Sequence, residues 1–229
     1  MKDATDITVI LDRSGSMDMI KADTIGGFNQ FLAEQQKEPG ECSLTLIQFD
    51  TQNAQEYVCN AVPIADVKPL TELTFVPRAG TPLYDALGQA IVRTGERYAA
   101  MPEDQRPEKV LFIIITDGEE NSSKEYDRAK VFAMVGEQEK TYGWHFIYIG
   151  ANQDAMAVGA SVGVRAMASM TYAPTPDAIH ATYTSLSANV KSARIGARAQ
   201  MGANLGWTDE QRKRARGSGS GSSNRPKGQ

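Results

Sequence analysis

Long apolar runs are missing from this sequence of 229 residues. A transmembrane helix needs about 20 consecutive apolar residues, and no run approaches that length, so the sequence predicts no membrane span. The N-terminus, Met1-Lys2-Asp3, leads directly into an apolar strand pattern, and no secretory signal is visible there. We therefore expect a cytoplasmic protein.

Cysteine and histidine are scarce, with two residues of each. Cys42 and Cys59 do not have the spacing of metal ligands. In a reducing cytoplasm both thiols are expected to be free, and a disulfide across neighbouring strands is the alternative. His145 and His180 fall in a predicted strand and a predicted helix, where a structural role is favoured over a catalytic one.

Common catalytic motifs are also absent from the sequence. It contains no Gly-x-x-x-x-Gly-Lys loop, no His-Glu-x-x-His pair and no Gly-x-Ser-x-Gly elbow. Phosphotransferases that use a strand-end aspartate need a second aspartate two residues later, and Ser14 holds that position after Asp12. Asp50, Asp85, Glu119 and Glu120 are the acids expected near the same sheet edge, the last two in a solvated loop. Metal-dependent hydrolysis therefore stays an alternative without an evident general base.

The net charge of −4 is unevenly distributed along the chain. Residues 1–190 carry −11, whereas residues 191–229 carry +7. Residues 197–229 lack hydrophobic periodicity, and their Gly/Ser run cannot bury enough apolar surface to fold alone. We expect one α/β domain over residues 1–196 and a basic, Gly/Ser-rich flexible tail over residues 197–229. Nucleic-acid binding through that tail is a second alternative function.

Apolar runs predict buried strands over residues 7–11, 43–49, 110–116 and 145–150. The first and third runs do not alternate with polar residues, which is typical of parallel strands buried on both faces. Residues 55–62 do alternate, and a short polar link joins them to residues 43–49. That link has the length of a hairpin loop, so an antiparallel strand is expected at one edge of the sheet.

Apolar residues spaced three or four apart predict helices between the strands, over 17–35, 83–98, 126–136 and 179–190. A short helix is expected after Asn152. Ser122 and Glu125 have the spacing of a capping box, and Thr175 before Pro176 is typical of a helix start. Strands alternating with helices predict a doubly wound, mostly parallel central sheet with helices on both faces.

Oxygen-bearing side chains follow two of the predicted strands. Asp12 ends the first strand, with Ser14 and Ser16 at alternate positions after it, and Asp117 ends the strand over 110–116. Thr81 opens a helix. Singly, each of these residues is explained as a helix cap. Ligands of open α/β sheets bind beyond the carboxyl ends of the strands, however, so these five oxygens are expected to converge there. Such a set suits Mg²⁺, with Mn²⁺ and Ca²⁺ as alternatives, rather than zinc or copper.

Three motifs together resemble a von Willebrand factor A (VWA) domain over roughly residues 5–195. They are the Asp-x-Ser-x-Ser motif over 12–16, Gly-Thr-Pro-Leu-Tyr-Asp over 80–85, and Ile-Thr-Asp-Gly-Glu over 115–119. The resemblance implies a Rossmann-like VWA fold and a metal-ion-dependent adhesion site (MIDAS). The implied metal ligands are Asp12, Ser14, Ser16, Thr81 and Asp117.

The resemblance also implies a function. In VWA modules of this kind, the bound ion coordinates an Asp or Glu carboxylate of a partner protein. Because no general base is evident in the sequence, we expect this chain to bind a partner and to catalyse nothing. One residue departs from the usual pattern, because Arg13 replaces a small or apolar residue inside the first motif. We expect its cation near the mouth of the metal site, where it would tune which anions approach.

Overall fold

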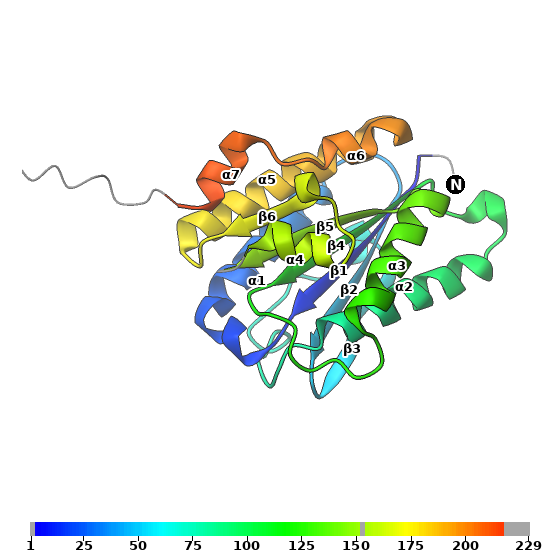
Figure 1. Cartoon of the computed structure of the whole chain (residues 1–229). Coiled ribbons are helices and arrows are strands. Elements are labelled where there is room, and N and C mark those ends of the chain that lie inside the picture. The colour runs from blue at the N-terminus through cyan, green and yellow to red at the C-terminus, as the bar shows by residue number, and fades with distance from the viewer. Residues whose placement is uncertain (1–2, 152–153, 218–229) are drawn as a thin grey trace, which may run out of the picture.

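The computed structural model describes residues 3–151 and 154–217, which form a six-stranded sheet flanked by helices (Figure 1). The strands are β1 (Thr5–Asp12), β2 (Cys42–Asp50), β3 (Asn53–Pro63), β4 (Lys109–Thr116), β5 (His145–Ala151) and β6 (Ser169–Tyr172). Their order is β3-β2-β1-β4-β5-β6, and every pair is parallel except β2 and β3. The predicted fold class, including its antiparallel edge strand, is confirmed.

Helices cover both faces of the sheet. One face carries α1 (Lys21–Gln35), α5 (Pro176–Ile195), α6 (Met201–Asn204) and α7 (Asp209–Ala215). The other face carries α2 (Leu83–Ala99), α3 (Arg128–Glu137) and α4 (Ala155–Ser161). Among the described residues, no helix combines the length and apolar character needed to cross a bilayer.

The sheet separates two hydrophobic cores because successive strand residues point to opposite faces. In β1, Val9 and Leu11 pack with the core under α1 and α5, whereas Ile10 packs with the core under α2 and α3. All eight residues of β1 are buried. This two-sided burial is the reason that the strand lacks alternation in the sequence.

Two buried cations hold the ends of helices. The ammonium of Lys109 at the start of β4 donates to the carbonyls of Arg194 and Gly196, at the end of α5. The guanidinium of Arg194 in turn donates to the carbonyl and the side-chain oxygen of Gln35, at the end of α1. Helix ends leave unpaired carbonyl groups with partial negative charge, which both side chains satisfy.

Helices α1 and α5 pack closely at Gly27, where there is no room for a larger residue. A Cβ on Gly27 would lie 2.2 Å from a ring carbon of Tyr183. We predict that Gly27→Ala destabilises the fold by about 1–3 kcal/mol, the usual cost of overpacking a core. Gly26 is the matched control, because a Cβ there meets nothing within 4 Å. Thermal melts should show a lower Tm for Gly27→Ala and an unchanged or higher Tm for Gly26→Ala; equal shifts would contradict this account.

Part of the segment expected to be a flexible tail is packed against the sheet. Met201, Leu205, Trp207 and Ala215 are buried in the core with α5. A capping box at Thr208 begins α7. The predicted boundary after residue 196 is therefore corrected, because the folded body continues through α7. Residues 218–229, which contain most of the Gly/Ser run, lie outside the described residues.

Two smaller features differ from the prediction. Strand β6 was not predicted, because its four residues are too few to produce a recognisable pattern. Helix α3 begins later than expected: its cap is Asp127, which accepts the N–H of Lys130, rather than Ser122. Cys42 and Cys59 are free thiols on neighbouring strands, as expected.

Candidate metal centre

The carboxyl ends of β1 and β4 lie side by side in the middle of the sheet. The two strands are parallel neighbours, with Leu11 opposite Ile115. Asp12 is the last residue of β1, and Asp117 follows directly after β4. The strand order reverses at this point, because β2 and β3 extend from one side and β5 and β6 from the other. Open α/β sheets bind their ligands at such a switch point.

Hydrogen bonds join the predicted ligands of the first and third motifs. Ser16 Oγ donates to Asp117 Oδ1 over 2.7 Å, and the hydroxyl oxygens of Ser14 and Ser16 are 3.1 Å apart. Asp12 Oδ1 accepts the backbone N–H of Ser14 over 2.7 Å. Its Oδ2 accepts the hydroxyl of Thr116 over 2.6 Å. Four of the five predicted residues therefore form one connected cluster.

Thr81 reaches this cluster from the loop before α2. A methyl group on Gly118 would lie 3.2 Å from Thr81 Oγ1. It would also lie 3.6 Å from the Ser16 hydroxyl oxygen and 3.9 Å from Asp12 Oδ2. Oxygens from three separate segments thus surround one point beside Gly118, and the structure brings all five predicted residues together.

Burial makes the two carboxylates costly to ionise without a counter-charge. Asp12 is fully buried, and burial raises its pKa to about 6, although hydrogen bonds from Thr116 and Ser14 act in the opposite direction. Burial also raises the pKa of Asp117 above its usual value. A bound cation would favour the ionised forms of both residues.

The donor set fits a hard divalent cation. Two carboxylates and three hydroxyls supply oxygen ligands only, which suits Mg²⁺, Mn²⁺ or Ca²⁺. Across residues 3–151 and 154–217, no three His, Cys, Asp or Glu side chains gather in a metal-binding arrangement. A cation at this point would therefore depend on the hydroxyl oxygens as well as on both carboxylates.

Solved structures that match this fold include VWA proteins and an adhesin. Proximal thread matrix protein 1 from the mussel byssus, with zinc in its MIDAS motif, matches 83% of this chain with a TM-score of 0.57 and 14% identity. A von Willebrand factor type A structure from Catenulispora acidiphila matches 82% with a TM-score of 0.52 and 13% identity. The chain has a von Willebrand factor A fold.

A pilus adhesin, SpaC from Lactobacillus rhamnosus GG, matches 82% of this chain with a TM-score of 0.62 and 13% identity. The matches cover 46% of the byssus chain, 43% of the Catenulispora chain and 30% of the adhesin, so this chain spans less than half of each. Neither a protein-family profile nor a curated protein matches the sequence.

The structure corrects the expected position of Arg13 in this VWA fold. Its side chain is only 3% exposed and pairs with Asp50 and Glu56 on the β2–β3 hairpin, rather than lining the metal mouth. Burial alone would raise the pKa of Asp50, but hydrogen bonds from Gln52 and Arg13 bring it below its usual value. The hydrogen bond from Arg13 likewise lowers the pKa of Glu56. Arg13 is thus neutralised within the protein and does not select anions.

Two acidic residues, Asp85 and Glu120, hold the loop between β4 and α3 in place. The sequence did not reveal this role for either of them. Asp85 accepts three successive backbone N–H groups, those of residues 124–126. Glu120 accepts the N–H groups of Tyr84, Ser122 and Ser123. Glu120 was expected in a solvated loop, but it joins this loop to the start of α2. These bonds hold Asp117 and Thr81 in register.

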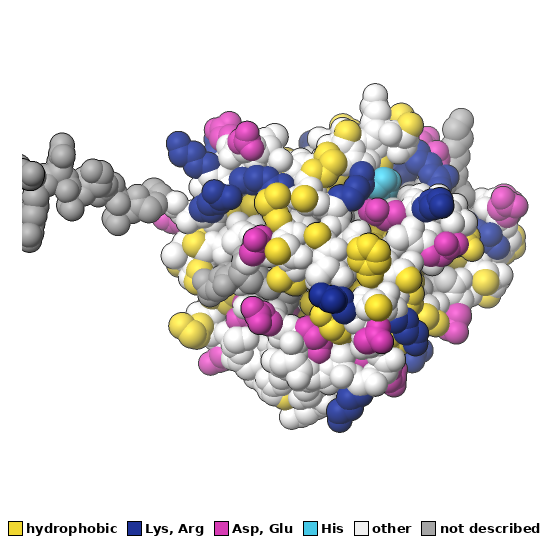
Figure 2. All heavy atoms as spheres, viewed as in Figure 1, with side chains coloured by type: hydrophobic (Ala, Val, Ile, Leu, Met, Phe, Trp, Pro, Cys, Tyr) yellow, Lys and Arg dark blue, Asp and Glu magenta, His cyan; other side chains and the backbone are white. Residues whose placement is uncertain are grey.

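The histidines and basic residues on which the alternative functions would depend lie away from the metal centre. His145 begins β5, at the sheet edge opposite the metal centre, and His180 lies on α5. Basic side chains gather over α7 beside acidic ones (Figure 2). Arg212 donates to three backbone carbonyls, and Arg214 pairs with Glu210. The basic charge of α7 is therefore partly used inside the protein.

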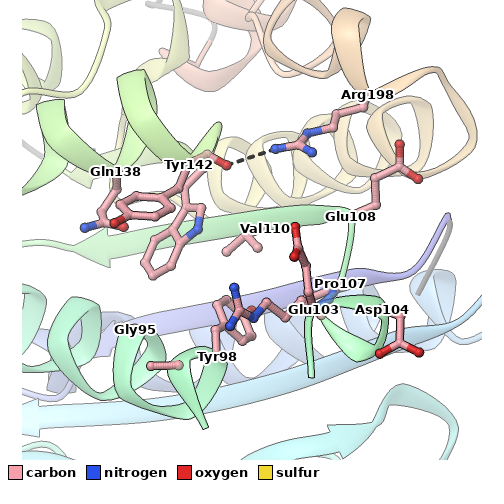
Figure 3. Close-up of a pocket in the computed structure, with 13 residues that line it drawn as sticks. Gly95, Tyr98, Glu103, Asp104, Pro107, Glu108, Val110, Gln138, Tyr142 and Arg198 are labelled. Atoms are coloured by element: carbon pink, nitrogen blue, oxygen red, sulfur yellow. Dashed lines mark hydrogen bonds between the residues drawn. The ribbon is translucent and has the colours of Figure 1, made fainter. Parts of the chain in front are cut away.

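A cavity of about 980 Å³ lies at the sheet edge opposite the metal centre (Figure 3). It is lined by the end of α2, the start of β4 and the turn before β5, with Tyr98, Val110 and Trp144 among its residues. Arg198 donates to the Tyr142 carbonyl at its rim. None of the five predicted metal ligands lines this cavity.

Proposed function

We propose that this chain is a divalent-metal-dependent protein-binding module of the VWA type. The proposed metal ligands are Asp12, Ser14, Ser16, Thr81 and Asp117. One observation carries the proposal: oxygens from three separate segments surround the point beside Gly118, where the fully buried Asp12 has a raised pKa. Mg²⁺ is the ion that we favour, with Mn²⁺ and Ca²⁺ as alternatives.

The residues of the site favour an anionic partner group. When bound, the cation supplies a Lewis-acidic position that accepts one further oxygen ligand. Three of the five side chains are neutral hydroxyls, so the two carboxylates at most balance its charge. A partner carboxylate from Asp or Glu suits such a position. We propose binding rather than catalysis. His145 lies at the amino end of β5, at the end of the sheet opposite the metal centre, and cannot act as a base here.

Exposed apolar side chains beside the site support a protein partner. Met19 and Leu73 are 93% and 90% exposed. Met19 follows Ser16 by three residues in a 3₁₀ helix, where side chains at that spacing share one face. Lys21 pairs with Glu72, which places Leu73 near the same helix. Exposed apolar side chains that gather into one patch are typical of protein-binding surfaces.

Metal binding is tested directly by titration calorimetry. We predict one site for Mg²⁺ or Mn²⁺ in the wild type, and loss of that site when Asp12 and Asp117 are both replaced by Ala. Zn²⁺ is titrated as a third cation, because the structure of the byssus protein carries zinc in its MIDAS motif. Retained binding in the double variant would refute the ligand assignment.

Partner binding is tested by affinity capture from lysate with and without EDTA. We predict a partner that is released by EDTA, that returns with Mg²⁺ and that is not captured by the Asp12→Ala variant. Substituting one Asp or Glu of the captured partner with Ala should abolish the complex. A complex that survives both EDTA and Asp12→Ala would contradict the proposed mechanism.

A further inference from the structure

Arg13 uses every hydrogen-bond donor of its guanidinium. Nε and Nη2 donate to Asp50 Oδ2 over 2.9 and 2.6 Å. Nη1 donates to Gln48 Oε1 over 3.1 Å and to Glu56 Oε1 over 2.7 Å. Nη2 also donates to Glu56 Oε2 over 2.6 Å. Five bonds on a nearly buried side chain fix its position tightly, because guanidinium donors have a rigid planar geometry.

A second arginine is bound to the same two carboxylates. Arg78 donates from Nε to Asp50 Oδ2 over 2.9 Å, and from Nη2 to Glu56 Oε2 over 3.2 Å. The two arginines, from the loops after β1 and before α2, form a neutral cluster with the two carboxylates of the β2–β3 hairpin. The cluster does not include any of the five predicted metal ligands.

The backbones of the two arginine loops are also paired. The N–H of Arg78 donates to the Arg13 carbonyl over 2.8 Å, and the N–H of Gly15 donates to the Ala79 carbonyl over 3.0 Å. One of these segments leads into Ser14 and Ser16, and the other leads into Thr81. The loops that supply the three hydroxyls are therefore joined both by backbone bonds and through Asp50 and Glu56.

We infer that Arg13 is a positioning residue for the metal site. Through Asp50 and Glu56 it holds the loop that carries Ser14 and Ser16 in register with the loop that carries Thr81. This inference rests on the proposed function, since it concerns the same site. Neutral hydroxyls are weak ligands, so their contribution to affinity depends on being held in place before the ion arrives. Groups that orient metal ligands in this way commonly change metal affinity by 10–100-fold when altered.

The test compares metal affinity in the wild type, Arg13→Lys and Glu56→Gln. An ammonium cannot replace the five-donor fork, and Gln at position 56 removes the charge that both arginines share. Glu56 is 41% exposed, so this second variant is expected to fold even where Arg13→Lys does not. Calorimetric titration with Mg²⁺ and Mn²⁺, well below the Tm of each variant, should give a dissociation constant about tenfold or more above that of the wild type.

Arg97→Lys is the matched control. Arg97 forms an ion pair with the buried Asp6 at the opposite sheet edge, so its loss should lower the Tm without changing metal affinity. The inference is overturned if Arg13→Lys and Glu56→Gln keep the wild-type dissociation constant, or if Arg97→Lys weakens binding as much as they do. Absence of metal binding in the wild type itself would instead refute the proposed function, and the inference with it.

Discussion

Asp12→Asn is expected to raise the Tm of the metal-free protein while abolishing metal binding. Asp12 is fully buried, and burial raises its pKa from 3.8 to about 6. At pH 7 the folded, metal-free protein therefore holds a carboxylate in an environment that favours the neutral form. An amide has nearly the same shape without the charge. A shift of this size corresponds to roughly 2–3 kcal/mol, or about 4–12 °C in Tm.

The pH dependence of this effect follows from the sign of the pKa shift. The folded-state pKa of Asp12 lies above the unfolded value, so the wild type loses stability as the pH rises from about 4 through about 6. The variant has no such group to ionise. The difference in Tm should therefore be small near pH 4 and complete above pH 6. Metal affinity should fall over the same interval as the pH is lowered, because protons compete for the carboxylate.

Thermal melts of both proteins at pH 4, 5.5 and 7 in EDTA check the prediction. Saturating Mg²⁺ should raise the Tm of the wild type and leave that of the variant unchanged, because only ligands that bind the native state stabilise it. A lower Tm for Asp12→Asn at pH 7 would show that the lost hydrogen bonds outweigh the removed charge.

Truncation after Gly196 is expected to lower the Tm by more than about 10 °C. It removes the buried side chains of Met201, Leu205 and Trp207 and exposes the part of the core that they cover. Each such side chain stabilises the fold by about 1.5–3 kcal/mol, and 1 kcal/mol shifts the Tm of a domain this large by roughly 2–4 °C. A flexible tail over residues 197–229, as the sequence predicts, would instead leave the Tm nearly unchanged.

A chain ending at Gly217 is the matched control, since it keeps every described residue after the truncation point. Its Tm is expected to stay within about 2 °C of the full chain, because the removed segment is rich in Gly and Ser. Trp207→Ala separates packing from chain length. It should account for about 3–5 kcal/mol of the loss. An unchanged Tm after truncation at Gly196 would mean that α6 and α7 contribute no stability.

The central strands were predictable because burial on both faces leaves a pattern that can be recognised in the sequence. Strands buried on both faces consist of unbroken apolar runs, as in β1 and β4. The placement of Asp12 and Asp117 side by side followed in turn, since parallel neighbours end at one edge. Binding of a metal at that edge stays a prediction.

The direction of the Arg13 side chain was not predictable from its neighbours in the motif. Its guanidinium extends to Asp50 and Glu56 on a hairpin, 37 and 43 residues away in sequence. Asp85 is similar, because its partners are backbone N–H groups, which every residue except proline carries. Such contacts leave no mark in composition or periodicity.

The packed segment after α5 was missed for a related reason. Its helices α6 and α7 are only four and seven residues long, too short for a repeating apolar stripe. Leu205 and Trp207 are buried by tertiary contacts. A single tryptophan between basic and glycine-containing stretches gives no signal of a helix or strand.

The reactivity of Lys109 can be used to measure local opening of the fold. Its ammonium is enclosed between β4 and the end of α5, with only 2% of the residue exposed. Acylating reagents in solution attack exposed lysine amines quickly, whereas this one reacts only after α5 has detached from the sheet. When reclosing is faster than acylation, mass-spectrometric measurement of acylation at Lys109 therefore gives the fraction of molecules in which that helix is open. The reactions at exposed Lys130 and Lys140 calibrate the reactivity of the reagent in the same sample.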